Sequence, residues 1–223
     1  MPTFKIIIGD KNLSSWSLRP WLALAQSGVA FDEVVVPLNQ PTTKAAIAAL
    51  SPNARVPALH VLTGGLGDDV VISESLAICE LINEEVPAAQ LWPADRVARA
   101  YARAASNEMH AGLSALRSNM PMNVCARLPG VGRAPGVQAD IDRITTIWRE
   151  SRARFGSVAQ PGGPFLFGKF SIADAMFAPV VTRFRTYVVE LDDVCQAYCD
   201  AVWALPAMKQ WEAAAVLEVA PKP

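Results

Sequence analysis

The sequence of 223 residues is poor in cysteine and histidine, and this scarcity excludes most metal centres. Its four cysteines form no Cys-x-x-Cys motif, and neither of its two histidines, His60 and His110, has a cysteine close by. The positions of these cysteines and histidines therefore match no spacing that is typical of metal ligands. We therefore expect no metal site and four reduced, mostly buried thiols.

Charge is also sparse, since charged residues make up 18% of the chain and the net charge is -1. Such a balance lacks the basic excess of a nucleic-acid-binding protein. No apolar run is long enough to span a membrane, and residues 1–10 lack the basic region and cleavage site of a signal peptide. Hydrophobic residues reach 52%, enough for a sizeable core. We expect a soluble, cytoplasmic protein.

The first 85 residues alternate between strand and helix patterns. The patterns predict strands at 4–8, 32–37, 58–62 and 70–72, and helices at 18–26, 42–50 and 75–84. Three glycines within residues 63–69 predict a turn between the last two strands. Strands interleaved with helices indicate a mixed sheet with helices on its faces.

The rest of the chain reads as helical. The patterns predict helices at 96–119, 137–155, 172–189, 194–204 and 206–216. Stretches rich in proline and glycine interrupt them at 120–136 and 160–164, and Pro87 and Pro93 indicate a linker. The expected fold class is α/β plus all-α, with one domain at residues 1–86 and an all-helical domain at 94–223.

Ser14 and Ser15 lie between the first predicted strand and the first predicted helix. Pro20 is tolerated in the first turn of a helix, so regular helical bonding is expected to start near residue 16 or 17. The two hydroxyls then lie near unpaired backbone N–H groups, where an anion is favoured. A hydroxyl that donates to a thiolate lowers the thiol pKa from about 8.5 by about one to two units. The alternative is that these serines only cap the helix.

Two later motifs also stand directly before regular structure. Val56-Pro57 precedes a strand, where a cis proline would leave the Val56 backbone free to pair with an extended peptide. The sequence does not decide between the cis and trans isomers. Glu74-Ser75 opens a helix, and a carboxylate beside a hydroxyl can bind an ammonium and a carboxylate together. The alternatives are an ordinary loop proline and a plain helix cap by Ser73 or Ser75.

A fourth motif is structural. Ser171-x-x-Asp174, preceded by Phe170, fits a capping box with a hydrophobic staple. We expect it to begin a helix and to take no part in chemistry.

Taken together and in this order, the serine pair, Val56-Pro57 and Glu74-Ser75 resemble the cytosolic glutathione S-transferase family, especially its serine classes such as zeta and tau. The resemblance covers nearly the whole chain. It implies a thioredoxin-like N-terminal domain that binds glutathione and a helical C-terminal domain that contributes the electrophile site. It also implies a cytoplasmic homodimer that conjugates the glutathione thiolate to small apolar electrophiles, with glutathione as co-substrate and no metal, nucleic-acid or membrane partner.

The resemblance also assigns the catalytic serine. In the serine classes it lies five residues before an arginine on the first helix, which is Arg19 here, and this spacing places it at Ser14 with Ser15 as its neighbour. The sequence departs from the family pattern at Trp16, where Cys or Pro is frequent, and at Pro20, where a small aliphatic residue is usual. The choice between the two serines therefore stays open.

Further residues are implied for the two substrates. The backbone of Val56, held by Pro57, would pair with the cysteinyl unit of glutathione, and Glu74 with Ser75 would hold the γ-glutamyl group. Lys44 and Arg55 are candidates for binding the glycine carboxylate of glutathione. The candidates for the electrophile site are Asn107, His110 and Leu113. The last three share a face of the predicted helix 96–119 by their spacing. An inter-helix or surface position for His110 is the alternative.

The zeta-type Ser-Ser-Cys motif is incomplete in this sequence, so that class's isomerase activity does not transfer with the resemblance. Two other functions remain open. One is glutathione-dependent isomerisation or peroxide reduction, and the other is a non-catalytic glutathione-binding protein of the same fold.

Overall fold

The computed structural model describes residues 3–62, 69–156 and 162–220. Most of the predicted turn at 63–69 and part of the predicted break at 160–164 lie outside the described residues. The elements of the first part are β1 (Thr3–Gly9), α1 (Ser15–Ser27), β2 (Phe31–Val36), α2 (Thr43–Ala48), β3 (Ala58–Leu62), β4 (Val70–Ser73) and α3 (Ser75–Glu85). This confirms the predicted alternation of strands and helices.

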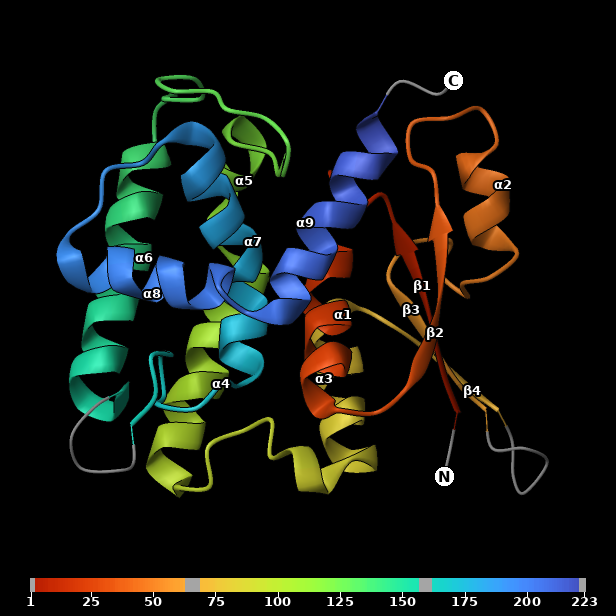
Figure 1. Cartoon of the computed structure of the whole chain (residues 1–223), viewed down its shortest axis with the longest axis horizontal. Coiled ribbons are helices and arrows are strands. Elements are labelled where there is room, and N and C mark those ends of the chain that lie inside the picture. Colours follow the sequence, from red (N-terminus) through yellow and green to blue (C-terminus); the bar gives the residue numbers. More distant parts are fainter. Residues whose placement is uncertain (1–2, 63–68, 157–161, 221–223) are drawn as a thin grey trace.

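The strands form one mixed sheet in the order β2-β1-β3-β4. β1 is parallel to β2 and antiparallel to β3, and β3 is antiparallel to β4. Side chains of β1 alternate between the two faces, so Ile6 and Ile8 join the main core while Ile7 packs with Ile47 of α2. Figure 1 shows α1 and α3 on one side of the sheet and α2 on the other. The mixed sheet with helices on its faces is confirmed.

The second part is helical, as predicted. It comprises the 3-10 helix η1 (Pro87–Ala89), the π-helix η2 (Arg152–Gly156), and the α-helices α4 (Arg96–Ala111), α5 (Ser114–Asn119), α6 (Val137–Ser151), α7 (Ile172–Tyr187), α8 (Asp193–Trp203) and α9 (Pro206–Val219). Among the described residues no helix combines the length and apolar character that crossing a membrane would require.

The prediction of one continuous helix over 96–119 is wrong. α4 ends at Ala111, and Leu113 has a left-handed backbone with φ of 57° before α5 begins. The guanidinium of Arg117 donates to the carbonyl oxygens of His110 and Gly112, at 3.0 and 3.1 Å, and so satisfies acceptors that the broken helix leaves open. Leu113 therefore leaves the helix face that it was expected to share with His110.

α7 is the central helix of the second part, and every residue in it except Arg185 is buried. It packs against α1, whose Arg19 Nε donates to the carbonyl oxygen of Met176 at 3.1 Å. The predicted capping box begins this helix, because the Ser171 backbone N–H donates to Asp174 Oδ2 at 2.8 Å. The other carboxylate oxygen accepts from the Leu166 N–H at 3.1 Å. Burial raises the pKa of Asp174 to about 6.

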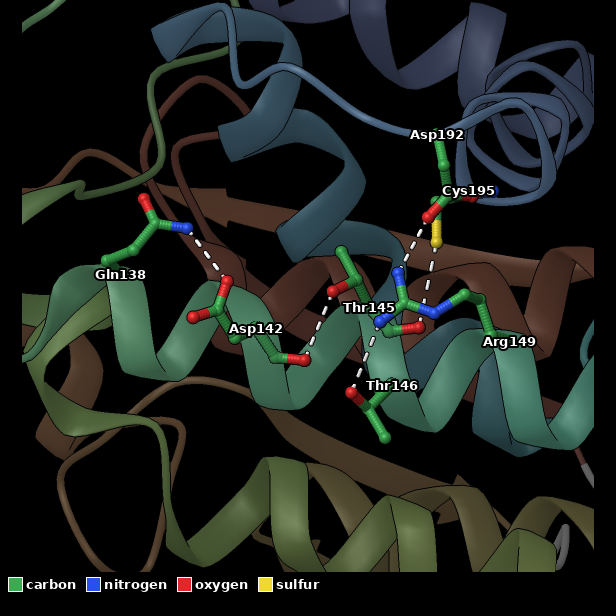
Figure 2. A network of polar contacts seen from close by, with 7 residues as sticks. All are labelled: Gln138, Asp142, Thr145, Thr146, Arg149, Asp192 and Cys195. Carbon is green, nitrogen blue, oxygen red and sulfur yellow. Dashed lines mark hydrogen bonds and ion pairs between the residues drawn. The ribbon is translucent and has the colours of Figure 1, made fainter.

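Polar contacts join α6 to α8 at the far side of the helical part, as Figure 2 shows. The Arg149 guanidinium donates to Asp192 at 2.6 Å, and the Cys195 thiol donates to the carbonyl oxygen of Thr145 at 3.6 Å. Asp192 also caps α8 by accepting from the Cys195 N–H at 2.9 Å. All four cysteines are free thiols and three of them are buried, while Cys125 is exposed.

Candidate active site

Ser14 occupies the N-cap position of α1, so the helix begins at Ser15, earlier than the position of Pro20 suggested. Its hydroxyl donates to Ser17 Oγ at 2.7 Å, and Ser17 Oγ also accepts from the Gly9 N–H at 3.1 Å. Within the described part of the chain, the Ser14 side chain makes no capping hydrogen bond. Its hydroxyl is therefore held in a short chain of hydrogen bonds between the end of β1 and the first turn of α1.

The start of α3 lies against the start of α1. The Ser75 hydroxyl donates to the carbonyl oxygen of Trp16 at 2.7 Å, and Ser75 is buried. The alternative of a plain helix cap by Ser73 or Ser75 does not hold, because the N-cap position is Glu74 and no side chain of the described residues caps it. Two helix N-termini thus meet at one point, and their unpaired N–H groups favour an anion there.

A cavity of about 260 Å³ opens at this meeting point. Its lining comes from the first turn of α1, the α2–β3 connection, the start of α3 and the end of α4, and consists of Trp16, Asn53, Arg55, Val56, Pro57, Glu74, Ser75 and His110. The structure therefore brings together the Val-Pro motif, the Glu-Ser motif and His110, which lie far apart in the sequence.

Other predicted residues, all of them described, lie outside this lining; they are Ser14, Ser15, Lys44, Asn107 and Leu113. Ser14 and Ser15 directly precede the cavity residue Trp16. Lys44 is exposed on α2, and Asn107 is exposed with its amide donating to the Arg103 carbonyl at 2.9 Å. Leu113 is buried in the core.

The segment that carries Arg55 and Val56 is built by an Asn turn and a cis proline. The side-chain oxygen of Asn53 accepts from the Arg55 N–H and from the Ser51 hydroxyl, both at 3.0 Å. The Val56–Pro57 peptide bond is cis, which answers the question that the sequence left open. The β3–β4 ladder begins at the pair Ala58–Ser73, so Val56 lies just before the paired part of the strand.

Glu74 has a strained backbone, with φ of 75° and ψ of 125°. A residue other than glycine rarely adopts such angles, and a conformation of this kind costs about 1–3 kcal/mol. Strain of this kind concentrates at ligand-binding sites. Here it places an exposed carboxylate at the cavity, one residue before the N-terminus of α3.

The wall formed by Trp16 and His110 is surrounded by positive charge. The two rings meet edge to face with centroids 5.2 Å apart, and the guanidinium carbons of Arg19 and Arg117 lie 4.1 and 4.9 Å from the Trp16 ring centroid. Arg19 is fully buried, and its two terminal nitrogens have no hydrogen-bond partner in the part of the chain described. Burial, with Arg183 and Arg117 nearby, lowers the pKa of Arg19 well below its usual value.

His110 faces this cavity, and its surroundings favour the neutral form of the imidazole. Burial and the Arg19 charge lower its pKa below the ordinary 6.5, while Glu74 acts in the opposite direction. Nδ1 is buried and has no hydrogen-bond partner among the residues described. A neutral ring at this position can accept one hydrogen bond and donate another without adding charge to the wall.

Trp16 and Asn53 line the cavity although the sequence did not predict them there. For Asn53, the Pro-Asn pair before Arg55 was a signal, since such pairs favour turns. Among the described residues no group of three or more His, Cys, Asp and Glu side chains could hold a metal ion.

Comparison with known proteins places the chain in a family. Residues 13–85 match the family model "Glutathione S-transferase, N-terminal domain", and residues 99–214 match "Glutathione S-transferase, C-terminal domain". The maleylacetoacetate isomerase of Rattus norvegicus is 28% identical over 184 residues, which cover 80% of this chain and 77% of that protein.

Two further relatives differ in what they cover. A probable maleylacetoacetate isomerase of Caenorhabditis elegans is 36% identical over 105 residues. The match covers 47% of this chain and 46% of that protein, so this chain spans about half the length of that relative. The crystal structure of a Burkholderia glutathione transferase homologue with bound glutathione has a TM-score of 0.67 at 22% identity, covering 96% of this chain and 98% of that chain. That structure supports the fold. The protein belongs to the glutathione S-transferase family of enzymes, with a thioredoxin-like N-terminal part followed by a helical C-terminal part.

Proposed function

We propose that the protein binds glutathione in the cavity beside the start of α1 and conjugates its thiolate to a small electrophile. One observation carries the proposal. The cavity collects Val56, Glu74 and Ser75 from separate connections and lies where the N-termini of α1 and α3 meet. This arrangement offers a backbone edge, a carboxylate and unpaired N–H groups to a single extended peptide.

Each part of glutathione has a partner of suitable chemistry. The Glu74 carboxylate suits the ammonium of the γ-glutamyl group, and the N–H groups at the start of α3 suit its carboxylate. The Ser75 hydroxyl already donates to Trp16, so we assign its contribution to the backbone. Val56 pairs with the cysteinyl unit, and Arg55 binds the glycine carboxylate. Lys44 ranks second for that carboxylate, because it lies outside the cavity lining whereas Arg55 belongs to it.

We assign thiol activation to Ser14 first and to Ser15 second. Ser14 is the N-cap residue, next to the unpaired N–H groups of α1. The Ser14 hydroxyl donates its proton to Ser17 Oγ, with 2.7 Å between the two oxygens. Donation to a thiolate therefore requires the Ser14 hydroxyl to rotate, or its proton to be shared between Ser17 Oγ and the thiolate. Ser15 lies beside Ser14 at the first helical position and has no such partner among the described side chains.

The second substrate lies on the His110 side of the cavity. Of the three predicted electrophile residues, His110 is the one within the lining, while Asn107 and Leu113 remain more distant candidates. Glutathione-dependent isomerisation is the alternative activity, because the rat and nematode relatives are named maleylacetoacetate isomerases.

Calorimetric titration with glutathione tests the binding proposal. We expect wild-type protein and a Glu84→Ala control, changed at an exposed glutamate of α3, to bind alike. Glu74→Ala should bind about 10-fold or more weakly, since a hydrogen bond to a charged group is worth about 1.5–3 kcal/mol. Equal binding by all three proteins would remove Glu74 from the site. Assays with small electrophiles, hydroperoxides and maleylacetoacetate then separate conjugation, peroxide reduction and isomerisation.

We further propose that the protein is a cytoplasmic homodimer, in keeping with its family. Residues 1–86 would bind glutathione, and residues 94–223 would contribute the electrophile site. His110, from the helical part, and Glu74, from the first part, line the same cavity and support this division.

A further inference from the structure

The five residues that precede the helix, Asp10 to Ser14, form what we call the serine loop. Its backbone is held by segments that lie far from it in the sequence, rather than by its own turn alone. Figure 1 shows the last helix, α9, running beside α1 toward the end of β1 from which this loop leaves. Polar contacts from four separate segments fix the loop, namely α9, β2, the β2–α2 connection and the segment after α5.

Glu218, in the last turn of α9, makes the most specific of these contacts. Its two carboxylate oxygens accept from two consecutive backbone N–H groups, that of Lys11 at 2.9 Å and that of Asn12 at 3.0 Å. A single carboxylate thus satisfies two adjacent donors of the loop. Hydrogen bonds of an ionised acceptor are shorter and stronger than neutral ones, so this clamp resists movement of the loop.

Lys11 fixes the same stretch from the other side. Its ammonium pairs with Glu33 of β2 at 2.5 Å and lies 5.2 and 5.6 Å from the ring centroids of Trp21 and Trp211. Trp211 of α9 donates its indole N–H to the Lys11 carbonyl oxygen at 2.7 Å. α9 therefore contacts the N–H and the carbonyl of Lys11 through two residues that lie seven positions apart on the helix.

The contacts of Asn12 and Asp10 complete the clamp. Asn12 accepts through its carbonyl oxygen from the Val124 N–H at 3.1 Å and through its side chain from the Cys125 N–H at 3.0 Å. The Asp10 side chain accepts from the Leu38 N–H at 2.9 Å, and its carbonyl oxygen accepts from the Ser14 N–H at 2.8 Å. The position of Ser14 is thus connected to Glu218 through a short, fully bonded stretch of backbone.

We propose that Glu218 is a positioning residue, through which α9 holds the serine loop in the geometry that activates the glutathione thiol. This inference rests on the proposed function of Ser14 and Ser15. Glu218 is not one of the residues that line the cavity, so its effect passes through the backbone of Lys11 and Asn12. A serine shifted by even a fraction of an ångström loses alignment with a thiolate, and catalytic geometry is sensitive at this scale.

The test compares Glu218→Gln with Glu212→Gln. Glutamine keeps one acceptor oxygen and sets an amide N–H₂ against a backbone N–H, so one loop donor loses its partner without any loss of volume. Glu212 lies on the same helix and pairs only with Lys209, at 3.3 Å, among the ion pairs of the described residues. The control variant therefore makes the same chemical change on α9 away from the loop.

Four measurements on the whole 223-residue chain give distinct outcomes. We expect Glu218→Gln to raise the pKa of bound glutathione's thiol and to lower kcat about 3- to 10-fold per folded molecule, with the Kd of glutathione changed less than about twofold. Amide hydrogen exchange in residues 10–14 should become faster in this variant alone. Glu212→Gln should match the wild-type protein in all four.

Two results would overturn the inference. One is faster exchange in the loop with kcat and thiol pKa unchanged, because the loop would then move without consequence. The other is a loss of glutathione affinity that parallels a loss of thermal stability, which would make Glu218 a general structural residue. A wild-type protein that binds no glutathione or leaves its thiol pKa at the free value would instead contradict the proposed function, and the exchange result would still report on the clamp.

Discussion

The Ser14 hydroxyl has an acceptor in Ser17 Oγ at 2.7 Å, and a bound thiolate would compete for the same proton. We expect Ser14→Ala to reduce turnover about 10-fold or more and to move the pH–rate profile toward higher pH, since one charged hydrogen bond is worth about 1.5–3 kcal/mol. Glutathione affinity should change little, because the hydroxyl favours the thiolate rather than the whole peptide. Steady-state kinetics across pH, with calorimetry alongside, gives both numbers.

Ser15→Ala is the matched comparison for this prediction. If it has the larger effect, the roles of the two serines are exchanged. If neither variant changes turnover, the thiolate is held by backbone N–H groups alone, and the hydroxyl has no part in the chemistry.

His110 should report the charge around the cavity through its own titration. Burial and Arg19 lower its pKa, so in the folded protein it takes up a proton at lower pH than in the unfolded chain, whose value is about 6.5. The stability that depends on a neutral His110 is present above about pH 6.5 and is lost as pH falls below it. We expect His110→Asn to lose less stability than wild type between pH 7 and pH 5 in denaturant unfolding.

His60 remains in both proteins of this comparison and cancels from the difference. NMR titration of the His110 ring gives the pKa directly. A midpoint at or above 6.5 would contradict the lowering of the His110 pKa by burial and by Arg19.

Single residues were predictable where a motif fixes local chemistry, as with the capping box at Ser171 and Asp174. The cavity positions of Trp16 and Asn53 were not predicted, because they depend on which connections meet in space. The clamp on the serine loop was equally hidden, since Lys11 and Glu218 are 207 positions apart.

The capping box at the start of α7 has consequences for a whole element. We expect Asp174→Ala to destabilise the protein by about 2–5 kcal/mol, because the cap is lost and the buried N–H groups of Ser171 and Leu166 lose their acceptor. Activity per folded molecule should be unchanged. Thermal melts and activity normalised to the folded fraction separate the effects, and a normal melting temperature with lost activity would place Asp174 in the chemistry.

The same carboxyl gives a pH-dependent prediction at this helix. The pKa of Asp174 is about 6 in the folded protein against 3.8 as its ordinary value, so the folded state holds the proton more tightly. Its favourable contribution is full below about pH 4 and is lost as pH rises through about 6. We expect the stability of wild type relative to Asp174→Asn to fall over this range by about 3 kcal/mol, at about 1.4 kcal/mol per pKa unit. A constant difference across pH would show that Asp174 does not titrate in this way.

Elements were predictable where periodicity and flanking residues agree, which holds for the β-α-β-α-β-β-α order of the first part. The prediction of one helix over 96–119 was wrong at Gly112 and Leu113, where the helix is interrupted although the helical spacing of apolar residues continues. Leu113 adopts a left-handed backbone because Arg117 and the buried position of its side chain compensate the local cost, and neither is visible in the sequence.

At the scale of the whole molecule, the N-terminal part and the helical part meet at the cavity. Trp16 and Glu74 line it from the first part, and His110 lines it from the second. We expect two chains in solution, so that light scattering coupled to size-exclusion chromatography gives twice the mass of the chain across a range of concentrations. A mass equal to one chain at all concentrations would contradict the homodimer.

The central claim is that this cavity lowers the pKa of the glutathione thiol. The most direct measurement is a pH titration of the thiolate absorbance of glutathione bound to wild-type protein, with free glutathione as reference. We expect a midpoint about one to two units below the free value of about 8.5. A midpoint equal to that of free glutathione, at saturating binding, would contradict it.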